Sequence, residues 1–126
     1  MVIRSSKARV QRKKMYNAPN HIKSKSVAAH LSTELRDKYG IRTARVCRGD
    51  TVVVIRGNED IKGNEGKVME VITKDGRILI DGVTIKQADG TAVARPVHAS
   101  NVVITKLDLT DEWRAELIKR NTEATK

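Results

Sequence analysis

The run Thr51-Val52-Val53-Val54-Ile55, followed after a polar loop by Lys67-Val68-Met69-Glu70-Val71-Ile72-Thr73, decides the fold class of this chain. Both runs are short and rich in β-branched residues, and glycine-containing loops bound them, which is typical of strands. The second run alternates, so that every other side chain faces the same side of a sheet. This part of the sequence predicts a small all-β domain.

Further strands follow from the same pattern. Asp75-Gly76 and Asp89-Gly90 are strong signals for hairpin turns, and Gly82 marks a bend or bulge. The expected strands span 51–55, 67–73, 77–81 with a continuation at 83–86, 91–95 and 101–107. Five short strands in about 57 residues predict a closed or nearly closed barrel, because closure removes exposed strand edges.

The sequence before the barrel divides into two parts. Residues 1–27 are polar and basic without helical or strand periodicity, so we expect them to be disordered until bound. Residues 27–39 are expected to be helical, in one helix or two. Ser32 is a suitable N-cap, and Gly40 is well placed to end the helix.

A last helix is expected after the barrel. Thr110 is a suitable N-cap, and acidic residues follow it in the first turn. Trp113 and Leu117 share one face at a spacing of four, and Glu116 and Arg120 are spaced to form an ion pair on the surface. Packing on the barrel and contact with a neighbouring protein are both open as roles for this helix.

Charge is divided very unequally along the chain. Residues 1–48 hold 13 Lys and Arg against two acidic residues, a net charge of 13 − 2 = +11. Residues 49–126 hold 12 basic and 13 acidic residues, a net charge of −1. A cationic arm on a nearly neutral body indicates a polyanionic partner, and nucleic acid is the first choice. Affinity should then fall steeply with salt, because bound phosphates release their counterions.

The aromatic residues narrow the kind of nucleic acid. The chain holds only Tyr16, Tyr39 and Trp113, with no Phe, so a sheet that stacks single-stranded bases is not expected. Tyr16, Asn17 and His21 in the arm are able to stack on, or hydrogen-bond to, an exposed base. The sequence therefore favours recognition of folded RNA by its backbone and shape.

No catalytic or metal site is visible in the sequence. The three histidines are scattered, and Cys47 has no second cysteine and no histidine at a ligand spacing, so it is expected to be a small, partly buried apolar side chain. The glycines do not follow the phosphate-loop spacing. We expect no enzyme, no cofactor, no metal and no small-molecule substrate.

Targeting signals are equally sparse. No apolar run approaches the roughly 20 residues of a membrane span, and the basic start lacks the apolar core of a secretory signal. A mitochondrial transit peptide is the competing interpretation, which Pro19 disfavours because it breaks an amphipathic helix. A soluble, intracellular protein without a membrane partner is expected.

One stretch resembles a known motif. Arg48-Gly49-Asp50-Thr51-Val52-Val53-Val54-Ile55-Arg56-Gly57, together with Lys62-Gly63-Asn64-Glu65-Gly66-Lys67-Val68, resembles the KOW motif of ribosomal proteins and transcription elongation factors. That motif is a strand, a glycine-rich loop and a strand, and its glycine is matched by Gly66.

Other stretches sharpen the resemblance to one family. DGVTIK at 81–86 and PVHASNV at 96–102 are similar to the large-subunit ribosomal protein numbered twenty-four in bacteria and twenty-six in eukaryotes. RKKMYNAP at 12–19 and AHLS at 29–32 resemble its archaeal and eukaryotic branch. The similarity runs from about Ser5 to Asp108.

The resemblance implies a mainly β protein with a small SH3-like KOW barrel of about five strands. We divide the chain into a basic RNA-binding arm with a short helix (1–45), the barrel (46–108) and a C-terminal helix (109–126). The implied function is that of a structural constituent of the large ribosomal subunit in the cytoplasm. It would bind rRNA toward the 5′ end, assist early assembly and lie near the polypeptide tunnel exit beside neighbouring ribosomal proteins.

The predicted RNA-binding residues form two groups. In the arm they are Arg4, Lys7, Arg9, Arg12, Lys13, Lys14, Tyr16, Asn17, His21, Lys23 and Lys25. On the barrel the resemblance implies Arg48, Lys62, Lys67, His98, Ser100 and Asn101, with Gly66 as the structural glycine. The loop 56–63 is longer and more acidic than the family pattern, and Glu59 and Asp60 would repel phosphate at its tip.

The sequence is also compatible with a second function. A KOW-type transcription elongation module would bind RNA polymerase or nascent RNA with the same barrel. Such factors usually carry another folded domain before the barrel, where this chain has a basic arm. The ribosomal interpretation is therefore favoured.

Overall fold

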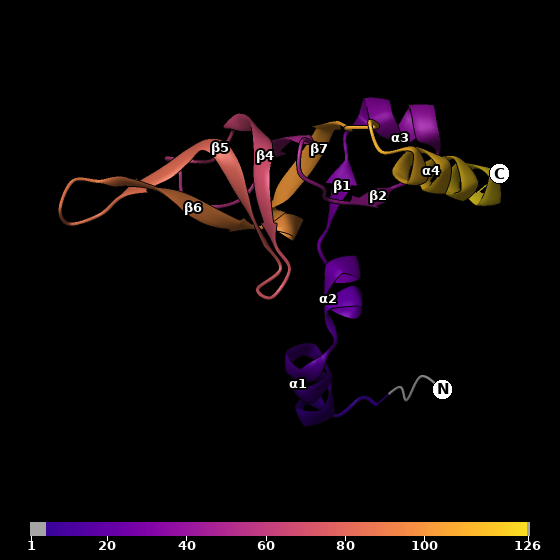
Figure 1. The fold of residues 1–126 in the computed structure, drawn as a ribbon, viewed down its shortest axis with the longest axis horizontal. Coiled ribbons are helices and arrows are strands. Elements are labelled where there is room, and N and C mark those ends of the chain that lie inside the picture. Colours follow the sequence, from indigo (N-terminus) through magenta and orange to yellow (C-terminus); the bar gives the residue numbers. More distant parts are fainter. Residues whose placement is uncertain (1–4, 126) are drawn as a thin grey trace.

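A computed structural model describes residues 5–125, so the predicted contact Arg4 lies outside the described residues. One sheet of seven strands has the spatial order β2-β1-β7-β3-β4-β5-β6 (Figure 1). The strands are β1 (Ala28–Leu31), β2 (Thr43–Arg45), β3 (Thr51–Val54), β4 (Glu65–Ile72), β5 (Arg77–Lys86), β6 (Ala92–His98) and β7 (Val102–Lys106). The helices are α1 (Ala8–Asn17), α2 (Asn20–Ser26), α3 (Thr33–Tyr39), the 3-10 helix η1 (Ala99–Asn101) and α4 (Glu112–Thr125). Within residues 5–125, none of the helices has the length and apolar character needed to span a membrane.

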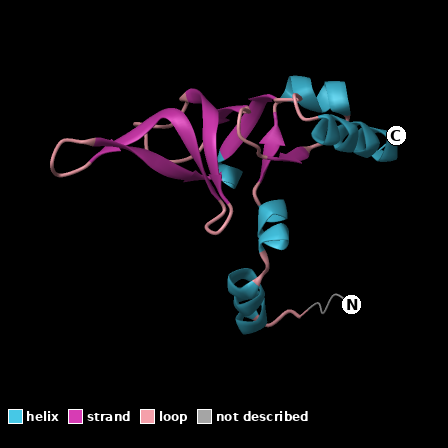
Figure 2. Ribbon diagram, viewed as in Figure 1, coloured by secondary structure: helices cyan, strands magenta, loops and turns pink. Residues whose placement is uncertain are grey.

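The mainly β, barrel-like fold is confirmed, and strands β3 to β7 fall where the sequence places five strands (Figure 2). Alternate residues of these strands are buried and form one apolar core, which includes Val52, Val68, Ile78 and Ile104. The predicted bulge is also present: Gly82 has φ +84°, and the pairing of β5 with β6 shifts register around it. The sheet therefore curls around a core that its own alternation pattern builds.

The helix expected over 27–39 is wrong for its first part. Residues 28–31 form β1, which pairs in parallel with β7 and antiparallel with β2. Its inward side chains Ala29 and Leu31 are buried, and so is the preceding Val27. Alanine and leucine favour helices in isolation, but burial at alternate positions and hydrogen bonds to a distant strand outweigh that preference. Residues 28–45 thus add two strands to the sheet, and the part of the chain that stands away from it ends at Ser26.

Helix α3 occupies the rest of the predicted segment. The Ser32 side chain accepts a hydrogen bond from the Leu35 backbone N–H at 3.5 Å, and Gly40 ends the helix with φ +66°. Both end signals are confirmed. They act through groups that the helix leaves without partners at its termini.

The N-terminal segment, which was expected to lack regular structure, contains α1 and α2. Residues such as Ala, Arg, Lys, Gln and Met favour helices even where no apolar stripe is present, and this explains the difference for α1. Neither helix has a buried residue. Figure 1 shows both standing away from the sheet, joined to it through β1. We call residues 5–26 the arm from here on, and residues 27–125 the body.

The C-terminal helix begins one position later than expected. The Trp113 backbone N–H donates to Asp111 Oδ1 at 3.1 Å, so Asp111 is the capping residue. Thr110 instead donates its backbone N–H to Asp108 Oδ1. Helix α4 lies beside α3 at the end of the molecule opposite to the long β5–β6 hairpin (Figure 1).

Candidate nucleic-acid interface

Helix α1 gathers predicted contacts on one face. Arg9, Arg12, Lys13 and Tyr16 are spaced at i, i+3, i+4 and i+7, so the helix places them side by side. All four are exposed, and the Tyr16 ring is 71% exposed. Three cations around one aromatic ring can hold phosphates while the ring stacks on an unpaired base.

Helix α2 continues the cationic arm. His21 and Lys25 are exposed, whereas Lys23 is half-buried because its Nζ donates to the Tyr16 backbone oxygen at 3.2 Å. Lys23 thus satisfies a carbonyl at the C-terminal end of α1, where the helix dipole favours a cation. One predicted RNA contact therefore helps to hold the two arm helices together.

The electrostatics of the arm work against its own folding. Residues 5–26 contain seven cations and no acidic residue: Lys7, Arg9, Arg12, Lys13, Lys14, Lys23 and Lys25. Arg9 and Lys13 are like charges one helical turn apart, which is destabilising. The first turn of α1 has neither an acidic residue nor a side-chain cap. An external anion would offset this repulsion.

On the body, Arg48 and Lys67 come together at an open cleft of about 500 Å³. The Gly49 N–H donates to the Val68 oxygen at 3.0 Å, and this hydrogen bond aligns the two cationic segments. Asp81 and Asp108 also line the cleft. A hydrogen bond from the Thr110 backbone N–H lowers the pKa of the Asp108 carboxyl, so that side chain is an anion at neutral pH. An RNA phosphate would contact the Arg48 and Lys67 side of this cleft.

His98, Ser100 and Asn101 meet at η1. His98 Nδ1 lies 2.8 Å from Ser100 Oγ and accepts the Ser100 backbone N–H at 3.2 Å. Because Nδ1 acts as an acceptor, the neutral ring carries its proton on Nε2, which can donate to an RNA acceptor. The Asn101 backbone oxygen accepts the Ile55 N–H at 2.9 Å, so this residue also holds the end of β3.

The loop between β3 and β4 is tied to the body by Ile61, which is buried. Lys62, Glu59 and Asp60 are all exposed on it. The structure thus leaves Lys62 accessible as a predicted contact, with two acidic neighbours on the same loop.

The structure explains why position 66 is a glycine. A Cβ atom at this position would lie 2.8 Å from Ile80 Cγ2 and would collide with the backbone oxygen of Asp81. Strand β4 therefore crosses β5 too closely for any side chain at Gly66.

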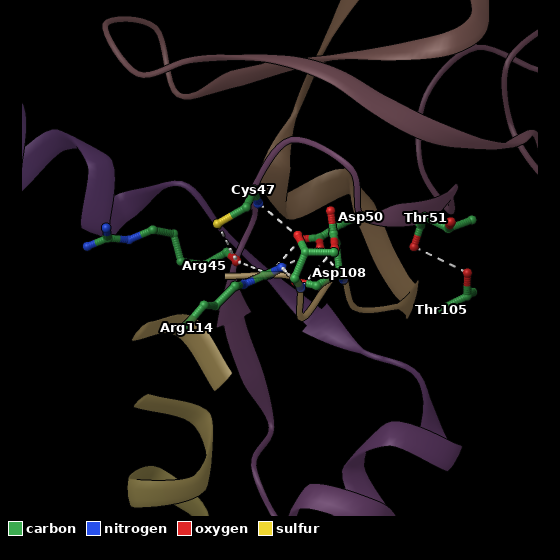
Figure 3. A network of polar contacts seen from close by, with 8 residues as sticks. Arg45, Cys47, Asp50, Thr51, Thr105, Asp108 and Arg114 are labelled. Carbon is green, nitrogen blue, oxygen red and sulfur yellow. Dashed lines mark hydrogen bonds and ion pairs between the residues drawn. The ribbon is translucent and has the colours of Figure 1, made fainter. Parts of the chain in front are cut away.

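Sequence reasoning missed a buried ion pair between the start of β3 and α4 (Figure 3). Asp50 is fully buried, and its two carboxylate oxygens accept from the Arg114 guanidinium at 2.5 and 2.7 Å. Asp50 also accepts backbone N–H groups from Cys47 at 3.0 Å and Asp108 at 2.9 Å. Arg114 donates further to the backbone oxygens of Asp108 and Arg45.

This ion pair fixes α4 to the barrel. Burial alone would lower the pKa of Arg114, but the hydrogen bond to Asp50 and its negative charge outweigh burial and raise that pKa. The partners are 64 residues apart in the sequence, and the only signal was an acidic residue directly before the apolar strand run 51–55. Packing on the barrel, one of the two roles considered for α4, is therefore real.

Cys47 borders the same network and is half-buried, as expected. Burial is the main cause that raises the pKa of its thiol, so the thiolate is disfavoured. This environment suits an unreactive cysteine.

The fold and its charges define a small β-barrel protein with a strongly cationic helical arm. Residues 5–121 match the sequence profile of a ribosomal protein family that comprises the eukaryotic proteins numbered twenty-six and the archaeal proteins numbered twenty-four. The Large ribosomal subunit protein uL24 of Sulfurisphaera tokodaii is 51% identical over 120 residues, which cover 95% of this chain and 88% of the relative. The proteins of the same name from Methanosarcina barkeri and Methanospirillum hungatei are 53% identical over 116 residues (92% of this chain, 98% of the relative) and 54% identical over 112 residues (89% and 92%).

The chain belongs to this family of ribosomal proteins, in its archaeal and eukaryotic branch. It is accordingly a structural component of the large ribosomal subunit and not an enzyme, with a ribosomal, cytoplasmic location. The family match also extends past Asp108 into α4, beyond the stretch in which the motifs resemble the family.

Proposed function

We propose that this protein binds large-subunit rRNA directly through two surfaces, the arm and the barrel surface that carries Arg48, Lys67 and His98. Its place is toward the 5′ end of the rRNA and near the polypeptide tunnel exit, and it acts early in assembly. The large-subunit name of its relatives and the family resemblance support the location. The proposed rRNA contacts rest on the exposure and charge of this chain's own residues.

The observation that carries the proposal is an arm of two helices without a buried residue or an acidic side chain. A helix that buries nothing draws no stability from packing, and a helix of 10 residues is marginal in water by itself. Phosphates would remove the repulsion between the arm cations and supply the missing contacts. Folded RNA, which offers phosphates on several sides, suits such an arm.

The barrel adds a second, less cationic surface. Arg48 and Lys67 at the cleft, and the Nε2–H of His98 at η1, present donors to RNA backbone and base edges. Hydrogen bonds at η1 hold the His98 ring, and a backbone hydrogen bond aligns the segments that carry Arg48 and Lys67, which lowers the ordering cost of binding. The body would set the register of the complex, and the arm would supply most of the salt-dependent affinity.

Early action in assembly follows from the shape of the arm. A segment that stands away from its body, as in Figure 1, enters a space between RNA helices most easily before those helices have closed. A protein bound in that way would hold the helices apart at the correct spacing while later proteins join.

The experiment that tests the proposal is a hydroxyl-radical footprint of the full chain on naked large-subunit rRNA. We expect two groups of protected nucleotides toward the 5′ end, and a variant lacking residues 1–26 should lose only one group. In a parallel footprint on nascent transcripts held by RNA polymerase, protection there but not on naked rRNA would instead favour the elongation-factor alternative. Absence of any protection would contradict direct rRNA binding.

A further inference from the structure

Helix α4 carries an exposed apolar stripe that its packing on the barrel does not use. Trp113 is 80% exposed, Leu117 is 51% exposed, and Leu109 just before the helix is 38% exposed. Trp113 and Leu117 are one turn apart, so their side chains lie side by side. Helix α4 is attached through Arg114 and the buried Ile118, which point to a different side of the helix.

A shallow apolar groove lies on the other side of this stripe. Its volume is about 280 Å³, and its lining includes Tyr39 from α3 together with Leu109, Ala115 and Thr122. The groove and the stripe meet at Leu109.

Three carboxylates stand between the stripe and the groove. On a helix of 3.6 residues per turn, Glu112, Glu116 and Glu123 fall within an arc of about 40° on the flank of Trp113 that faces away from Arg114. All three are exposed. Arg120 pairs with Glu116 at 3.3 Å, and the other cation on this flank is Lys119. The three carboxylates and two cations give this flank a net charge of 2 − 3 = −1, in contrast to the strongly cationic arm.

We propose that this face of α4, defined by Leu109, Trp113, Leu117 and the row Glu112, Glu116 and Glu123, docks a basic protein segment. The segment would place apolar side chains on Trp113 and in the groove, with Lys or Arg side chains over the glutamates. Large aromatic residues such as Trp are enriched among the residues that dominate binding energy in protein interfaces. Charge complementarity favours a cationic protein over RNA, because Glu112 and Glu123, which have no ion-pair partner among the described residues, would face a phosphate as like charges.

The ion pair that attaches α4 to the barrel makes this face of the helix suitable for docking. The bidentate Asp50–Arg114 pair fixes the helix to the barrel, so binding does not have to order it. The inference goes beyond rRNA binding and depends on the proposed function only in placing the partner within the large subunit.

The test uses the full chain with the photo-crosslinking residue p-benzoylphenylalanine in place of Trp113, assembled into large subunits in cells. Irradiation should give one adduct to a single protein of the subunit, within a segment of net positive charge. The same probe in place of Ile85 on the β5–β6 hairpin is the control and should not give that adduct. An adduct to rRNA, to lipid or to a second copy of this chain, or no adduct, would overturn the inference.

A charge reversal tests the acidic row separately. Glu116→Lys with Glu123→Lys should lower the crosslink yield from position 113 at least about fivefold, while Glu70→Lys with Asp75→Lys on the barrel should leave it unchanged. Equal yields from both pairs would overturn the assigned chemistry. Because the arm is intact in every variant, a missing adduct from chains that still enter the large subunit contradicts only the docking face. Chains that fail to enter the subunit would instead contradict the proposed rRNA binding.

Discussion

The arm and the body are stabilised in opposite ways. Helices α1 and α2 have no buried residue, and the arm that contains them carries seven cations without an acidic residue, whereas the body packs an apolar core and buries Asp50 against Arg114. The body therefore folds on contacts that it contains, and we propose that the arm is stabilised by charges that a partner supplies. Stability of the fold therefore comes from the body, and most of the charge available for binding lies in the arm.

The largest expected effect comes from removing the arm. Deletion of residues 1–26 keeps Val27, which is buried, and should lower affinity for large-subunit rRNA about 10³-fold or more at low salt, because the arm cations no longer meet phosphates. The free energy of unfolding of the body should change by less than about 0.5 kcal/mol, since no buried side chain is lost. Filter binding and urea unfolding measure the two quantities. If the body unfolds without the arm, the claim that the body is stable by itself is wrong.

The next effect belongs to the body alone. Arg114→Met leaves the Asp50 carboxylate buried without its partner and should cost about 3–5 kcal/mol of unfolding free energy. Arg120→Met removes only the exposed pair with Glu116 and should cost less than about 0.5 kcal/mol. Urea unfolding compares the two variants. Similar small losses for both would show that the buried pair does not hold α4.

A smaller loss is expected at Gly66. Gly66→Ala forces β4 away from Ile80 and the Asp81 backbone and should cost about 1–3 kcal/mol, as overpacking does in other cores. Thermal unfolding gives the loss, and rRNA binding of the folded fraction should keep its salt dependence. A change in that salt dependence would mean that the β3–β4 loop contributes phosphate contacts.

The smallest effect is expected at the acidic loop. Glu59→Gln with Asp60→Gln should change rRNA affinity less than about threefold, because we expect the tip of this loop to point away from the rRNA phosphates. Arg12→Gln with Lys13→Gln in the arm is the matched pair and should cost about tenfold or more at low salt, as two phosphate contacts are lost. A large gain in affinity from the loop variant would place its tip against RNA.

The sequence predicted features that rest on local pattern. Strands β3 to β7, the turns at Gly76 and Gly90 and the capping of α3 follow from neighbouring residues. Strand β1 was missed because its partner β7 lies some 70 residues away, and alanine and leucine alone favour a helix. The buried pair was missed for the same reason, since its two charges meet only after the barrel has closed.

The candidate binding site was also predicted only in part, because some of its features are local in the sequence and others depend on the fold. The cationic arm was visible as a charge imbalance, yet the grouping of Arg9, Arg12 and Lys13 around Tyr16 depends on a helix that was not expected. The meeting of Arg48 with Lys67 depends on the pairing of segments on either side of the β3–β4 loop. Charge can be counted along a chain, but which charges share a face is decided by the fold.

The salt dependence of rRNA binding tests the central claim most directly, with the arm helices kept and only their charge removed. Arg9→Gln, Arg12→Gln and Lys13→Gln should reduce the slope of log affinity against log salt by about 2 to 3. The control Lys74→Gln, Lys86→Gln and Lys106→Gln removes the same charge from exposed positions of the body and should leave the slope nearly unchanged. Equal slopes for the two variants would contradict an arm that carries the phosphate contacts.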